Sequence, residues 1–202
     1  VTSTFSAAWA TSPRSGISKS YSFTFQFKID STAPTMNNVS TSSTGKYTNS
    51  STYVYASDSM SGVDAIYMKT PGSSSYGNMG TSTTVSSSGT NGLYSFYAKD
   101  KAGNISRTYF LYLDTVKPTG TIKNSNGAEI TGSYTNQAFS YSATDSGSGI
   151  SYLQYKKPGS SSWLTYTSGT SISASAASGT YQFRSVDKAG NISATKSITL
   201  DS

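Results

Sequence analysis

The sequence predicts an all-β protein built from two tandem β-sandwiches, and three observations lead to this prediction. Apolar and polar residues alternate along short runs, which is the pattern of half-buried strands. No stretch carries a 3.6-residue hydrophobic period long enough for a helix. A long block of sequence also occurs twice at a constant interval, as expected when one folding unit is duplicated.

The repeat is defined by matching residues 87 positions apart, as from Asn49 to Asn136. The run from Asp100 to Ser106 returns at 187–193 without a single difference. The borders recur as well, because Asp30 and Asp114 each stand four residues before a proline. We therefore expect two modules, residues 31–114 (module 1) and 115–202 (module 2), with residues 1–30 left over.

The expected strands lie at matching places in the two modules. Tyr94, Phe96 and Ala98 alternate with polar residues, as do the residues at 181–185, and the last strand of each module lies at 109–113 and 198–200. Further strand-like runs occur at 53–56, 66–68, around 85, at 138–142, 152–155 and around 172. Pro-Gly, Ser-Gly, Asn-Gly and Ala-Gly-Asn turns separate these runs. About seven short strands in each module fit an immunoglobulin-like β-sandwich, with Tyr94 and Tyr181 as corner tyrosines.

The leftover N-terminal segment ends in one more alternating run, at residues 23–29. This run resembles the last strand of a module, so residues 1–30 are either the tail of a preceding module or an independent strand or hairpin segment. An apolar strand without a partner invites pairing with other chains. Its candidate partners are residues 5–10, module 1, or a neighbouring molecule that accepts the strand.

The composition excludes several classes of chemistry. The chain has no Cys and no His, a single Glu, and only 12% charged residues. A Ser-His-Asp or Cys-His nucleophile and a Cys/His zinc site therefore cannot be assembled, and we expect no catalytic residues and no enzymatic activity. The 15 Lys and Arg residues are scattered, so the net charge of +6 predicts no nucleic-acid partner. No apolar run approaches membrane-spanning length, so we expect no membrane insertion.

The few aspartates occupy repeat positions, with the exception of Asp64. In an immunoglobulin-like sandwich, the chain entry, the loop between the second and third strands and the loop between the last two strands share one end. The fold would therefore gather two sets of three, namely Asp30, Asp58 and Asp100, and Asp114, Asp145 and Asp187. Each set could bind Ca²⁺, which takes six to eight oxygen ligands, and no other cofactor is expected. Alternatively, each aspartate caps its own turn.

The aromatic residues offer a second candidate site. Trp163 and Tyr166 follow the polar run Ser160-Ser161-Ser162, where aromatic rings could stack on sugars. The alternative is that these rings belong to the core.

These motifs resemble the bacterial immunoglobulin-like repeat domains. The resemblance rests on Ser-Gly-Val/Ile, Pro-Gly-Ser-Ser-Ser-Tyr/Trp and above all Asp-Lys-Ala-Gly-Asn-Ile-Ser, and it covers residues 31–202. Such domains occur in tandem on secreted and cell-surface proteins, including adhesins and glycoside hydrolases. The resemblance implies an extracellular, non-catalytic spacer or adhesion module, or alternatively a carbohydrate-binding accessory region of a secreted glycoside hydrolase. It implies as partners the neighbouring modules of the same polypeptide, and a glycan or a host or cell-surface protein.

Overall fold

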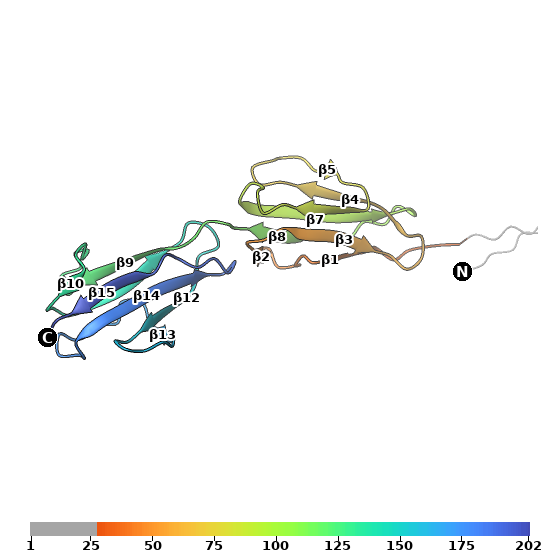
Figure 1. The fold of residues 1–202 in the computed structure, drawn as a ribbon. Coiled ribbons are helices and arrows are strands. Elements are labelled where there is room, and N and C mark those ends of the chain that lie inside the picture. Colours follow the sequence, from red (N-terminus) through yellow and green to blue (C-terminus); the bar gives the residue numbers. More distant parts are fainter. Residues whose placement is uncertain (1–27) are drawn as a thin grey trace, which may run out of the picture.

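The computed structural model describes residues 28–202, and within them it is all-β, with 15 strands and no helix (Figure 1). The described part accordingly contains no helix long and apolar enough to cross a membrane. The expectations for a hairpin, a module tail or a donated strand fall almost wholly in residues 1–27, outside the described residues. The rest forms two immunoglobulin-like β-sandwiches that follow one another end to end (Figure 1).

Module 1 pairs a three-stranded sheet, in the order β1-β3-β6, with a five-stranded sheet in the order β2-β8-β7-β4-β5. Its strands are β1 (Thr35–Asn37), β2 (Lys46–Thr48), β3 (Thr52–Ser57), β4 (Val63–Lys69), β5 (Gly77–Asn78), β6 (Ser82–Val85), β7 (Gly92–Asp100) and β8 (Tyr109–Leu113).

Module 2 repeats this plan with a two-stranded sheet, β11-β9, and a five-stranded sheet, β10-β15-β14-β12-β13. Its strands are β9 (Thr119–Asn124), β10 (Tyr134–Thr135), β11 (Phe139–Thr144), β12 (Ile150–Lys156), β13 (Leu164–Tyr166), β14 (Gly179–Asp187) and β15 (Lys196–Leu200). The strand expected around Ile172 is reduced to a single bridge with Phe139. Val85, which holds the matching position in module 1, pairs with Thr52 within a strand.

The repeated Tyr-Thr-Asn motif marks the point where the chain changes sheets. In module 1, β1 runs antiparallel to β3, and the chain then crosses to β2, which runs parallel to the last strand, β8. In module 2, β10 pairs with β15 in the same parallel manner. The first segment of each module thereby covers an edge of both sheets, which leaves less unpaired backbone exposed.

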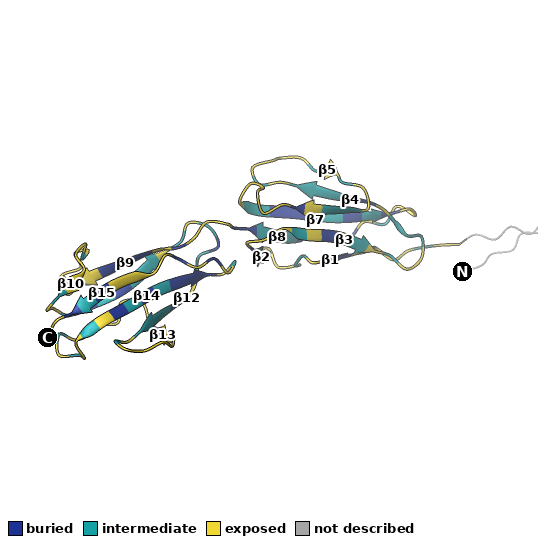
Figure 2. Ribbon diagram, in the orientation of Figure 1, coloured by how far each residue is buried: buried dark blue, intermediate teal, exposed yellow. Residues whose placement is uncertain are grey.

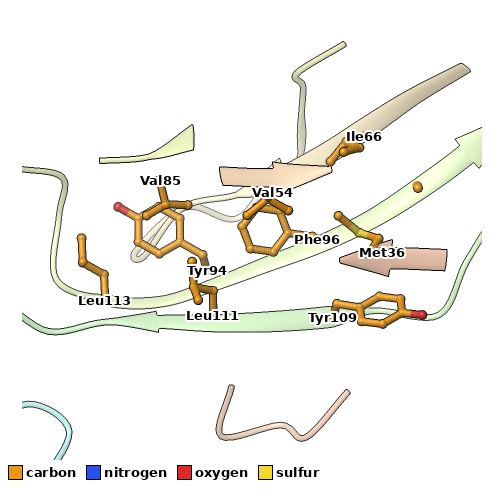
Figure 3. Packing of buried hydrophobic residues seen from close by; sticks show 10 residues of the cluster. Met36, Val54, Ile66, Val85, Tyr94, Phe96, Tyr109, Leu111 and Leu113 are labelled. Carbon is orange, nitrogen blue, oxygen red and sulfur yellow. The ribbon is translucent and has the colours of Figure 1, made fainter. Parts of the chain in front are cut away.

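The two cores form between the inward faces of the sheets. In module 1, Met36 and Val54 of the smaller sheet meet Phe96 and Leu111 of the larger one (Figure 3). Burial varies along β7, and buried and half-buried residues alternate strictly from Phe96 to Asp100 (Figure 2). The core of module 2 is more aromatic, with the ring of Tyr141 stacked 5.0 Å from that of Phe183.

Tyr94 and Tyr181 are the expected corner tyrosines. The Tyr94 hydroxyl donates to the carbonyl of Thr90 at 2.9 Å, and the Tyr181 hydroxyl donates to the carbonyl of Ala177 at 3.1 Å. Both bonds reach back four residues and tie the loop to the strand that follows it. The prediction from the Gly-x-Tyr motif is confirmed.

Candidate metal centre

The structure brings six of the seven repeated aspartates into two clusters of three. One carboxylate oxygen from each of Asp30, Asp58 and Asp100 lies within 4.8 Å of the others, and the same holds for Asp114, Asp145 and Asp187. We call these the entry cluster and the junction cluster. The entry cluster lies where the chain enters module 1, and the junction cluster joins the linker residue Asp114 to two loops of module 2.

The linker aspartates, Asp30 and Asp114, join the linkers to the β3–β4 loop and the β11–β12 loop, respectively. Asp114 is fully buried, and its carboxylate accepts the backbone N–H of Val116 at 3.0 Å and that of Ser148 at 2.6 Å. Asp30 accepts the equivalent amides of Thr32 and Ser61, both at 2.9 Å. Hydrogen bonding by Ser61, followed by that of the Thr32 amide, holds the pKa of the Asp30 carboxyl below its ordinary value.

The second aspartate caps its own loop with one oxygen and leaves the other oxygen without a partner. One oxygen of Asp145 accepts the N–H groups of Gly147 at 3.1 Å and Gly149 at 2.7 Å, while its Oδ1 is buried and unpaired. Asp58 caps its loop in the same way, and its Oδ2 is buried and unpaired. Turn capping therefore occupies only one oxygen of Asp58 and of Asp145 and leaves the other oxygen available.

The third aspartate is held by the Asp-Lys-Ala-Gly-Asn loop, which accounts for the repetition of this motif. Asp187 accepts the backbone N–H of Asn191 at 2.8 Å and its side-chain amide at 2.7 Å. The same side-chain amide donates to the carbonyl of Asp114 at 2.8 Å, so Asn191 ties the loop to the linker. Gly190, with φ near 93°, supplies the left-handed backbone conformation that the loop needs.

Among the described residues, the junction cluster gathers three carboxylates that have no cationic hydrogen-bond donor. Within residues 28–202, the hydrogen bonds to its three carboxylates all come from neutral amides. Asp114 and Asp187 are also buried, so water screens their repulsion poorly. Carboxylate oxygens, with backbone carbonyls nearby, are the ligands that Ca²⁺ takes, and the set offers no sulfur or imidazole that would favour a softer metal.

Contacts across the junction add to those of the linker. The Tyr112 hydroxyl at the end of module 1 donates to the carbonyl of Gly147 at 3.4 Å, and the Lys188 amine lies 5.7 Å from the centre of the Tyr47 ring. A side chain on Gly147 would collide with Asp114, since a Cβ there would lie 2.4 Å from its Oδ2. The loop of module 2 and the linker are thus in direct contact.

The two residues expected to stack on sugars lie in different surroundings. Tyr166 is buried, its hydroxyl accepts the N–H of Tyr141 at 2.9 Å and donates to the carbonyl of Thr170, and its ring packs edge-on against Phe183. The expectation that Tyr166 stacks on a ligand is therefore wrong, because the ring is a core residue. Trp163 is half-buried under two cations, with the Arg184 guanidinium 4.2 Å and the Lys156 amine 4.8 Å from its ring.

A pair of exposed aromatic residues was missed by the sequence reasoning. Tyr53 and Tyr55 on β3 are 54% and 39% exposed, although both lie in a predicted strand. The duplication could have pointed to this pair. The matching positions of module 2 carry Ser140 and Ser142, so the two tyrosines are not part of the pattern that the modules share.

The comparisons with known proteins add a remote likeness in fold. No family model matches the chain, and no curated protein matches it. Among solved structures, it is similar to the fibronectin(III)-like modules of Clostridium thermocellum CbhA, at 15% identity and a TM-score of 0.38. That match covers 82% of this chain and 92% of the other. A likeness this distant carries no argument about function.

Proposed function

We propose that the chain is a non-catalytic spacer or adhesion segment of a bacterial extracellular protein, whose modules are held at a fixed angle by Ca²⁺. The junction cluster carries the proposal, because Asp114 belongs to the linker while Asp145 and Asp187 belong to loops of module 2. An ion bound by all three would connect the linker to both loops. In module 1, an ion bound by Asp30, Asp58 and Asp100 would connect the segment before Thr32 to two loops of that module.

The far end of module 2 supports neighbouring modules as partners. The backbone N–H of Asp201 donates to the carbonyl of Thr135 at 2.9 Å, as that of Asp114 donates to the carbonyl of Thr48 at the same distance. Tyr134 is 74% exposed, whereas Tyr47 at the matching position of module 1 is half-buried and lies below Lys188 of module 2. The end of module 2 thus carries half of a junction like the one inside the chain.

The alternative function, a carbohydrate-binding accessory region of a secreted glycoside hydrolase, no longer has the support of Tyr166. Trp163 remains as its candidate from the sequence. Loss of glycan binding in Trp163→Ala would support that alternative, and an unchanged binding profile would remove Trp163 from it.

The test of calcium binding is the substitution Asp145→Asn, measured by thermal unfolding in EDTA and in calcium. Asparagine keeps an oxygen that caps the loop, but it removes one of three negative charges within 4.8 Å. Each such pair repels by about 3 kcal/mol at an effective dielectric constant of about 20. The variant should therefore be at least as stable as the wild type in EDTA.

In calcium the order should reverse. The wild type gains about 2.7 kcal/mol when the free calcium concentration is 100 times the dissociation constant, and the variant gains less because it lacks a ligand. Asp64→Asn is the matched control, since Asp64 is exposed and outside both clusters, and it should respond to calcium as the wild type does. A wild-type melting temperature that is identical in EDTA and in millimolar calcium would refute calcium binding.

The mechanical part of the proposal has its own measurement. Small-angle X-ray scattering of the two-module protein should show a narrower range of inter-module arrangements in calcium than in EDTA. Asp145→Asn should show the same wide range in both. If calcium raises the melting temperature but does not change the scattering, the ion stabilises a module without fixing the angle between the modules, and the mechanical part of the proposal is refuted.

A further inference from the structure

The exposed pair Tyr53 and Tyr55 stands in the centre of the smaller sheet of module 1. The strand β3 lies between β1 and β6, and Val54, between the two tyrosines, is fully buried in the core. The alternation along the strand therefore directs both tyrosines away from the core. Their ring centres are 5.6 Å apart and their planes differ by 23°, so the two rings are stacked against each other.

The surroundings of this pair are polar but uncharged. Thr84 on β6 stands opposite Tyr53, and Ser82 on β6 and Asn37 on β1 stand on either side of Tyr55. The strands β1, β3 and β6 contain no Asp, Glu, Lys or Arg at all. Although the protein has a net charge of +6, the three strands of this face carry only uncharged side chains, with hydroxyl and amide groups around the two rings.

Pairing with the preceding strand does not need these tyrosines. In module 2 the matching strand β11 carries Ser140 and Ser142 at the corresponding positions and still pairs with β9, although its other neighbour is reduced to the single bridge between Phe139 and Ile172. The stacked pair on β3 is therefore a feature of module 1 that β11 of module 2 does not share. Contiguous exposed apolar surface is a feature of interaction sites.

We infer that the face around Tyr53 and Tyr55 binds a neutral polysaccharide. A pyranose ring presents a face of C–H groups to the electron-rich face of an aromatic ring, and its hydroxyls can bond to the Ser, Thr and Asn side chains beside it. The lack of charge complements an uncharged chain, whereas a nucleic acid or an acidic glycan calls for Lys or Arg. This inference goes beyond the spacer role and does not depend on calcium.

The test is affinity electrophoresis of the two-module protein in gels that contain hydroxyethyl cellulose, xylan or galactomannan. At least one of these neutral polysaccharides should retard the wild type. The double variant Tyr53→Ser/Tyr55→Ser, which copies module 2, should bind at least about tenfold more weakly, as stacking on one ring alone contributes that much. Tyr152→Ser is the matched control, because Tyr152 is 47% exposed but lies on module 2, and it should bind like the wild type.

The variants should stay folded, since surface substitutions usually change stability by less than about 0.5 kcal/mol, and thermal unfolding verifies this. The inference fails if none of the three neutral polysaccharides retards the wild type, or if the double variant is retarded equally. It also fails if polygalacturonate, an acidic polysaccharide, binds at the tyrosines in preference to the neutral ones. Sedimentation velocity gives a further test. If the wild type is a dimer and the double variant is a monomer, this face is a protein interface and the inference is overturned.

Discussion

Replacing Gly147 with alanine should destabilise module 2 by crowding the buried carboxylate of Asp114. A Cβ at this position would lie 2.4 to 2.6 Å from three atoms of that carboxylate, whereas real Cβ contacts stay above 3.0 Å. Gly147 does not need the left-handed backbone region, so the obstacle is space alone. Either the carboxylate or the loop must move by several tenths of an ångström.

The size of the effect follows from the bonds that would be strained. Asp114 accepts amides at 3.0 and 2.6 Å, and hydrogen bonds to a charged group are worth about 1.5–3 kcal/mol each. Module 1 indicates the smallest loss of stability to expect. Met60 occupies the position that matches Gly147, and Asp30 nevertheless keeps both of its amide bonds, although Asp30 is only half-buried. We therefore expect a loss of about 2–3 kcal/mol, less than both bonds together.

Tryptophan fluorescence can report on module 2 alone. The chain has two tryptophans, so Trp9→Phe leaves Trp163 as the only one. For a module of this size, a loss of about 2–3 kcal/mol lowers the melting temperature by about 10–20 °C. Met60→Ala in the same background should leave the module 2 transition unchanged. A Gly147→Ala protein that melts within about 3 °C of its parent would refute the steric argument.

Three further predictions concern the core and the loops. Burial raises the pKa of Tyr166, which favours its neutral form in the folded protein. Its contribution to stability should therefore be complete below a pH of about 10 and should decline as the pH rises further. Urea unfolding from pH 8 to 11 measures this decline, and a free energy of unfolding that does not change over that range would contradict it. Tyr166→Phe leaves the buried N–H of Tyr141 unpaired and should cost about 1–3 kcal/mol in urea unfolding at pH 7, whereas a neutral result would mean that the hydroxyl does little. Asn191→Ala should destabilise its module more than Asn104→Ala does, because Asn191 is the more buried of the two, and equal losses of melting temperature would count against this.

The sequence predicted the parts of the fold that the duplication and the strand period encode. Alternation located β7 and β14, and the Gly-x-Tyr motif located the corner tyrosines. The repeated aspartates pointed to one end of each module because the order of strands in a sandwich determines which loops share an end. The sequence could not tell that one oxygen of Asp145 caps the loop while the other remains free.

The errors came from side chains whose direction depends on the partner sheet. Tyr166 follows a polar turn, as a surface residue would, but its strand faces the aromatic core around Phe183. Tyr53 and Tyr55 alternate with Val54, and the alternation alone does not say which of the two sets faces inward. The parallel pairing of β2 with β8 was also not predicted, because a three-residue strand has too short a period to recognise.

That parallel pairing determines how each module would respond to tension. The chain enters a module at one end and leaves it at the other, so a pull on the chain draws β2 and β8 in opposite directions along their common axis. The hydrogen bonds between them are then loaded in shear, all at once, instead of opening one after another as in a hairpin pulled apart from its end. The pairing of β10 with β15 places module 2 in the same situation. Each module therefore resists extension through the bonds between β2 and β8 or between β10 and β15.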